Sequence, residues 1–369
     1  MSALQRDPGD RVQVLDVDGQ LVEGAAPPDL DDETLMEMYR TMRLARRYDE
    51  RAVSLQRQGR MGTYPPMAGH EASQVASAMA LGPDDWVFPS FREHAVMLAL
   101  GLPMKQTLRY WMGNESGNQI PDDLSIFPVC VPLATQIPHA TGAAWASKLK
   151  GDDNVTVVYF GDGATSEGDF HEGLNFGGVF DVPCIYFCSN NQWALSVPRE
   201  NQTASDTLAQ KADAYGFEGV QVDGMDPFAV YQVTREAVEK ARSPDDNELR
   251  PTLIEAVQYR YRGNTTVDDP SVYRSEEQVE AWKRRDPLPR LETFLRETGR
   301  LDDEAIETID AEIEAEIADA IEAAENAPKT DPSDIFDYVF AEPTPPVDAG
   351  KASLRELRER HGDDTILEE

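Results

Sequence analysis

The residue types best suited to chemistry stand where two apolar runs of the chain end. Asp162 lies between two glycines directly after the β-branched run 155–160, and Asn191 follows the apolar run 184–188. Glycines at the end of a buried strand let a phosphate approach the backbone, but a carboxylate between them repels a bare phosphate. Magnesium would remove the conflict, because it takes protein oxygens and phosphate oxygens in one shell.

These two side chains can meet only if their strands are neighbours. A helical stretch over 168–180 separates the two apolar runs, so strand, helix and strand form a parallel unit whose carboxyl ends share one edge. The stretches 220–222 and 252–258 are further strand candidates and flank a predicted helix over 227–242. The sequence therefore predicts an α/β fold, doubly wound about a largely parallel sheet.

The remaining segments frame this unit. Residues 1–30 have no sustained periodicity and are interpreted as an extended arm, while 31–326 is expected to form the main domain, ending in charge-rich helices over 276–326. Residues 327–369 are expected to be a linker, marked by Pro343–Pro346, and a charged tail or peripheral helix. The stretch 113–138 is long and rich in Gly, Asn and Pro, which favours a functional loop.

Charge excludes one large class of partners. The chain has 34 Lys plus Arg against 68 Asp plus Glu, a formal charge of −34, whereas nucleic-acid binding needs clustered cations. The basic clusters Arg43/Arg46/Arg47 and Lys283/Arg284/Arg285 are interpreted as solvated helix faces. Molar salt screens the mutual repulsion of so many surface carboxylates, so we expect a salt-adapted protein. The alternative is an acidic protein of an ordinary cell.

The chain also lacks the marks of a membrane or disulfide-bonded protein. No apolar run approaches the roughly 18 residues of a membrane helix, and the start of the chain has no apolar signal region, so we expect a cytoplasmic location. The three cysteines, Cys130, Cys184 and Cys188, are too few for a disulfide framework and are expected to be buried thiols.

The spacing of Asp162 and Asn191 in the sequence is similar to that of a known family. The pattern G-D-G-x26-N-N resembles the magnesium and thiamin diphosphate signature, and Ser166 at the third glycine position weakens a nicotinamide-binding interpretation. Over nearly its whole length the chain resembles the alpha subunit of the thiamin-dependent decarboxylating component of 2-oxo acid dehydrogenase complexes. The matching stretches are 69–72, 89–92, 132–138, 161–176, 190–191, 222–226 and 268–274.

The resemblance implies roles for individual residues. Asp162, the side chain of Asn191 and the main-chain carbonyl of Trp193 would bind Mg²⁺. Thiamin diphosphate would be bound by Phe91, Arg92, Leu133, Asp162, Gly163, Ala164, Asn191 and Asn264. A potassium site of branched-chain members would correspond to Cys130, Pro132, Thr135 and Gln136.

Two positions depart from the family pattern. Asn264 stands where relatives carry a catalytic His that contacts the diphosphate, and Ser189 stands where branched-chain relatives have Arg. The resemblance implies oxidative decarboxylation of a branched-chain 2-oxo acid or pyruvate. It also implies a beta subunit that supplies the activating Glu, in a two-alpha, two-beta assembly, and a lipoyl domain that accepts the acyl group. An acetoin-cleaving relative and a non-catalytic structural or regulatory paralogue are the alternatives.

Overall fold

A five-stranded parallel sheet forms the centre of the computed structural model, which describes residues 10–328, 330–337 and 339–363. The strand order is β1-β2-β3-β7-β6, and every neighbouring pair is parallel. The strands are β1 (Trp86–Phe88), β2 (Thr156–Gly161), β3 (Cys184–Asn190), β6 (Glu218–Asp223) and β7 (Thr252–Val257), and β4 (Trp193–Ala194) with β5 (Val197–Pro198) forms a separate antiparallel pair.

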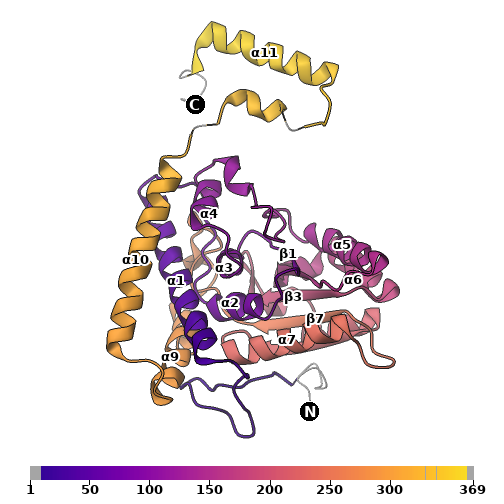
Figure 1. Ribbon diagram of the computed structural model, residues 1–369, viewed down its shortest axis with the longest axis vertical. Coiled ribbons are helices and arrows are strands. Elements are labelled where there is room, and N and C mark those ends of the chain that lie inside the picture. The colour runs from indigo at the N-terminus through magenta and orange to yellow at the C-terminus, as the bar shows by residue number, and fades with distance from the viewer. Residues whose placement is uncertain (1–9, 329, 338, 364–369) are drawn as a thin grey trace.

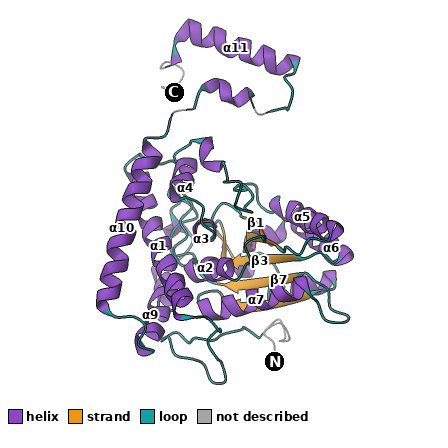
Figure 2. Cartoon of the chain, viewed as in Figure 1, coloured by secondary structure: helices purple, strands orange, loops and turns teal. Residues whose placement is uncertain are grey.

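Helices cover both faces of the sheet (Figures 1 and 2). Side chains alternate between the faces along each strand: Val157 and Tyr159 belong to one hydrophobic core, Val158 and Phe160 to the other. The helices are α1 (Asp32–Arg57), α2 (Glu71–Met79), α3 (His94–Ala99), α4 (Met104–Trp111), α5 (Gln136–Lys150), α6 (Gly168–Phe180), α7 (Pro227–Arg242), α8 (Glu276–Lys283), α9 (Pro287–Glu297), α10 (Asp303–Glu325) and α11 (Pro345–His361). This layering confirms the predicted doubly wound α/β class.

The predicted β-α-β unit is present with the expected register. β2 pairs with β3 in parallel, with Gly161 opposite Ser189, and α6 spans the predicted 168–180. β1, which has only three residues, and the short helices α2 to α4, which have six to nine residues each, were not predicted from the sequence.

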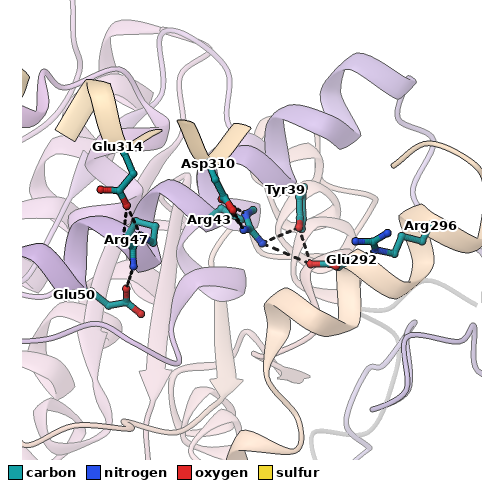
Figure 3. Close-up of polar contacts among 8 residues, drawn as sticks. All are labelled: Tyr39, Arg43, Arg47, Glu50, Glu292, Arg296, Asp310 and Glu314. Carbon is teal, nitrogen blue, oxygen red and sulfur yellow. Dashed lines mark hydrogen bonds and ion pairs between the residues drawn. The ribbon is translucent and has the colours of Figure 1, made fainter. Parts of the chain in front are cut away.

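A row of ion pairs joins α1 to the C-terminal helices (Figure 3). Arg43 donates to both carboxylate oxygens of Asp310 on α10, at 2.5 and 2.6 Å, and Arg47 contacts Glu314 one turn further along. Arg46 contacts the fully buried Glu71 and, at 3.1 Å, Asp286. The interpretation of this basic cluster as a solvated face is therefore wrong: it fastens one helix layer to another. Lys283 and Arg284 of the second cluster are exposed, as expected.

The N-terminal arm is tied to the far edge of the sheet. Val12 bridges Val222 of β6 in parallel. The carboxylate of Asp226 accepts hydrogen bonds from the backbone N–H groups of Val14 and Leu15 at 2.7 Å each and also caps α7. Residues 1–9, the start of the predicted arm, lie outside the described residues.

The C-terminal region is helical beyond the predicted linker. A short 3-10 turn over Pro332–Phe336 precedes α11, which Figure 1 shows beyond the end of α10. Pro345 and Pro346, assigned to the linker, begin α11 instead, where proline is tolerated because the first helical N–H groups have no helical partner. Among the described residues, no helix has the length and apolarity that crossing a membrane requires.

Candidate functional site

The carboxyl ends of four neighbouring strands converge on one cavity. Residues 90–93 follow β1, 161–164 close β2 and its turn, 191–195 follow β3, and 264–265 follow β7 by a longer loop. Ligands of open α/β sheets bind in the crevice outside the carboxyl ends of the strands, because the loops there expose backbone groups that the hydrogen-bonded strands do not. The cavity has a volume of about 480 Å³.

Most of the residues predicted from the sequence line this cavity. They are Phe91, Arg92, Cys130, Leu133, Gln136, Asp162, Gly163, Ala164, Asn191, Trp193 and Asn264. Pro132 and Thr135 are not among its lining residues. Residues 130–135 lie in the loop that the composition of 113–138 marked as functional, and Gln136 is the first residue of α5. This loop therefore reaches the cavity directly before α5 begins.

Asp162 and Asn191, the expected metal ligands, lie at the ends of two neighbouring strands. Asp162 is 1% exposed and follows β2; Asn191 is 6% exposed and follows β3, the neighbouring strand. Asn191 Oδ1 accepts a hydrogen bond from the backbone N–H of Trp193 at 3.2 Å, so its amide oxygen faces the turn that carries the Trp193 carbonyl. Gln192 makes this turn with a positive φ of 74°.

This donor set fits magnesium better than a softer metal. One carboxylate, one amide and one backbone carbonyl are all hard oxygen donors, which leaves room in an octahedral shell for phosphate and water. In the parts of the chain that the structure describes, no cluster of three His, Cys, Asp or Glu side chains could hold a metal. Burial raises the pKa of the Asp162 carboxyl, and a cation beside it would favour the charged form.

Gly163 allows a close approach of backbone that a larger residue would prevent. A Cβ added there would lie 2.8 Å from the Cβ of Ala194, which is too short for two carbon atoms. The turn after β2 and the hairpin after β3 can therefore pack against one another at the cavity wall. Ala164 is also buried, so the two residues of this part of the wall carry no long side chain that could fill the cavity.

Two buried guanidinium groups meet at Asn264. Arg92 is 5% exposed and donates to the Asn264 carbonyl oxygen at 2.9 Å and to Asn264 Oδ1 at 3.1 Å; Arg260, which is 1% exposed, donates to the same Oδ1 at 2.9 Å. The other hydrogen bonds of both groups go to neutral oxygens of Pro66, Leu195 and Tyr273. Burial, followed by the charge of Arg260, lowers the pKa of Arg92 to about 10. Two buried cations side by side favour an anion in the cavity.

The residues of the implied potassium site lie close in sequence but differ in environment. Gln136 is buried and donates to the Tyr159 carbonyl at 2.8 Å, while its Oε1 has no hydrogen-bond partner. Cys130 donates to the Pro132 carbonyl at 3.4 Å and is half-buried, so the expectation of three buried thiols is wrong for this one; Cys184 and Cys188 are buried. Thr135 directly precedes α5.

Arg260, Gln202 and His70, which lie in the site or contact its residues, were not predicted from the sequence. Arg260 and Gln202 lie outside every motif and gave no signal in the sequence. Ser189, already noted in the sequence as a departure from the branched-chain pattern, lines the cavity, and its buried hydroxyl has no partner. His70 also lines the cavity; both its ring nitrogens are buried and unpartnered, and burial lowers its pKa well below the usual range.

Comparison with known proteins places the chain in a family. The family model for the dehydrogenase E1 component matches residues 39–333. The 3-methyl-2-oxobutanoate dehydrogenase subunit alpha of Mycobacterium tuberculosis is 43% identical over 327 residues, covering 89% of this chain and 88% of that protein. The pyruvate dehydrogenase E1 component subunit alpha of Bacillus subtilis is 41% identical over 329 residues, with 89% and 88% coverage. The chain belongs to the dehydrogenase E1 component family, whose enzymes are 2-oxo acid dehydrogenases.

Proposed function

We propose that this E1 chain binds the diphosphate of thiamin diphosphate through Mg²⁺ in the cavity at the carboxyl edge of the sheet. The observation that carries the proposal is the placement of Asp162 and Asn191 at the ends of two paired strands, with Arg92 facing the same cavity. Asp162, Asn191 and the Trp193 carbonyl would hold the metal. Mg²⁺ itself follows from this donor set and the sequence pattern.

Other residues of the chain would position the cofactor. The backbone at Gly163 and Ala164 would face the diphosphate, Arg92 would offset its charge, and Phe91 and Leu133 would contact its apolar part. Leu133 is 47% exposed, which suits a side chain that contacts a ligand rather than the core. The cofactor, when bound, supplies the electron sink that decarboxylation of a 2-oxo acid requires.

The substrate would be a branched-chain 2-oxo acid or pyruvate, and the acyl group would pass to a lipoyl domain. The two relatives compared above are named for these two substrates. An acetoin-cleaving enzyme and a non-catalytic paralogue are not favoured by these relatives. Asn264 in place of the expected His keeps a hydrogen-bond donor at the cavity but removes a group that can exchange protons near neutral pH.

The active enzyme would be an assembly. We propose a beta subunit as partner in a two-alpha, two-beta complex, a lipoyl acyltransferase core as acceptor and a cytoplasmic location. Residues 31–326 would form the cofactor-binding domain, with 1–30 as an arm and 327–369 as a peripheral extension. A potassium ion at Cys130, Pro132, Thr135 and Gln136 would satisfy the free Oε1 of Gln136.

Binding and turnover of the alpha and beta subunits together test the proposal. Calorimetry should show thiamin diphosphate binding with Mg²⁺ and none after removal of divalent ions with a chelator. With an artificial electron acceptor, 3-methyl-2-oxobutanoate or pyruvate should be decarboxylated, and acetoin should not be cleaved. Failure to bind thiamin diphosphate in the presence of Mg²⁺ would overturn the proposal. Cleavage of acetoin without decarboxylation of either 2-oxo acid would instead identify acetoin as the substrate.

A further inference from the structure

Gln202 makes a contact with the proposed metal site that no motif indicates. Its Nε2 donates to Asp162 Oδ2 at 2.6 Å. A hydrogen bond this short to a carboxylate is of the charge-assisted kind. Gln202 thus holds one of the two oxygens of the only carboxylate in the proposed metal-ligand set.

The Gln202 amide is itself fixed in place. Its Nε2 also donates to the Val197 carbonyl at 3.2 Å, and its backbone N–H donates to the Arg199 carbonyl at 3.2 Å, closing the 3-10 turn Arg199–Asn201. Because both acceptors of Nε2 are oxygens, the amide cannot turn over without losing these bonds. The donor is therefore presented to Asp162 before any ligand binds.

The other end of the amide lacks a partner. Gln202 Oε1 is buried and accepts no hydrogen bond, and it is attached to the same carbon as Nε2, so it lies beside Asp162. An unpaired buried acceptor is costly. A hydrogen-bond donor arriving with a hydrated cation is the kind of group that would satisfy it, since magnesium commonly keeps several of its waters.

We propose that Gln202 is a positioning residue of the metal site, which withholds Oδ2 of Asp162 and leaves Oδ1 as the single carboxylate oxygen for the cation. The inference rests on the proposed function. One-oxygen ligation suits Mg²⁺, which demands near-octahedral geometry, whereas Ca²⁺ accepts bidentate carboxylates and a larger shell. Gln202 therefore contributes to selection of Mg²⁺ over Ca²⁺ as well as to affinity, as residues that orient metal ligands do elsewhere.

The test compares metal affinities in the alpha–beta complex. Calorimetric titration of Mg²⁺ and of Ca²⁺, each with saturating thiamin diphosphate, would be done for the wild type, Gln202→Met and Asn201→Ala. Methionine keeps the length of the side chain and removes both donors; Asn201 is an exposed neighbour on the same turn and serves as the control. We expect Gln202→Met to weaken Mg²⁺ binding about 10-fold or more, to weaken Ca²⁺ binding less, and thus to narrow the preference for Mg²⁺. Asn201→Ala should match the wild type.

A second variant separates positioning from a loss of structure. Gln202→Glu keeps the shape but places a second carboxylate beside Asp162, and it should shift the preference toward Ca²⁺, while the melting temperature without metal verifies that each variant is folded. Wild-type affinities and an unchanged Mg²⁺ to Ca²⁺ ratio in both variants would overturn the role of Gln202 and leave the proposed function standing. Failure of the wild type to bind thiamin diphosphate with Mg²⁺ would instead refute the proposed function.

Discussion

Asn264 Oδ1 accepts hydrogen bonds from two guanidinium groups at once, from Arg92 at 3.1 Å and from Arg260 at 2.9 Å. Two donors on one oxygen fix the orientation of the amide, so its Nδ2 is the group left to donate to a ligand. The family resemblance leads one to expect His at this position. Asn264 is therefore a fixed neutral donor between two cations, not a group that can gain and lose a proton.

Replacing Asn264 with His should affect one half-reaction selectively. An imidazole beside Arg92 and Arg260 is held neutral by their charge, and a neutral imidazole can still exchange a proton during acyl transfer. We expect lipoyl acylation by Asn264→His to be faster, and decarboxylation with an artificial acceptor to be nearly unchanged. Single-turnover rates of the two half-reactions measure this. Equal rates in both would show that the position has no special role, and loss of both would show that the loop depends on Asn.

The carboxylate of Asp162 should be indispensable for metal-dependent cofactor binding. Asp162→Ala removes the only anionic ligand and leaves neutral oxygens alone, so the affinity for Mg²⁺ with thiamin diphosphate should fall by about 100-fold or more. Asp169→Ala, which removes a partly exposed carboxylate on the nearby α6 that does not line the cavity, is the matched control. Calorimetry of the alpha–beta complex gives the comparison, and an unchanged affinity of Asp162→Ala would contradict the metal assignment.

The alpha chain alone should not turn over substrate. The cavity presents Asp162, Glu93 and Glu167 as its carboxylates; the first is assigned to the metal, and Glu93 is held by the backbone and hydroxyl of Ser90. The family resemblance assigns the carboxylate that activates the cofactor to the beta subunit. We expect no decarboxylation by the purified alpha chain and full turnover after mixing with the beta subunit. Substantial activity of the alpha chain by itself would contradict this division of labour.

Salt should act on the chain in two opposing ways. Molar KCl reduces the Debye length to about 3 Å and screens the repulsion of a chain with charge −34, but it also weakens partly exposed ion pairs such as Arg43 with Asp310. We expect the first effect to dominate and the melting temperature to rise with KCl. Arg43→Gln should destabilise by at most about 1 kcal/mol in dilute buffer and by less in 2 M KCl. The exposed Arg51 provides the control, Arg51→Gln. A melting temperature independent of salt would refute salt adaptation.

A buried histidine should make the fold sensitive to acid. Burial, followed by the charge of Arg92, lowers the pKa of His94 to about 3, against about 6.5 when unfolded. Between these values the unfolded chain binds a proton that the folded chain does not, so stability falls as the pH is lowered, by about 2 kcal/mol at pH 5.

Substituting His94 tests this linkage. His94 stacks on Tyr64, with ring centroids 5.1 Å apart, and His94→Phe keeps an aromatic ring of similar size without a titrating group. The difference in unfolding free energy between pH 7 and pH 5 should shrink by about 2 kcal/mol. His139→Gln, which replaces an exposed histidine, should leave this difference in unfolding free energy unchanged. A pH dependence of His94→Phe equal to that of the wild type would contradict the assignment.

The fold was predictable where local pattern and tertiary structure agree. β2, α6 and β3 have apolar runs of the right length, and the parallel pairing of β2 with β3 follows from the helix between them. β1 escaped prediction because Trp86–Phe88 is too short to show a period. The pairing of Arg43 with Asp310 was equally invisible, because it joins residues 267 positions apart and depends on how α10 packs on α1.

Some residues of the candidate site could be predicted from the sequence and others could not, for the same reasons. Asp162 and Asn191 could be predicted because the glycines and the strand ends give their positions, and both line the cavity. Arg260 and Gln202 could not, since a single polar residue in a loop has no periodicity, and their roles arise from contacts with Asn264 and Asp162 that only the folded chain creates.

The bridge between Val12 and Val222 has a consequence for solubility. β6 is the last strand in the order of the sheet, and an open edge strand is a template on which another chain can pair. The arm occupies that edge, and Asp226 secures it through the N–H groups of Val14 and Leu15. Detachment of the arm would thus leave the cavity at the other end of the strands intact while creating a self-associating surface, so the first sign of damage there would be aggregation rather than loss of cofactor.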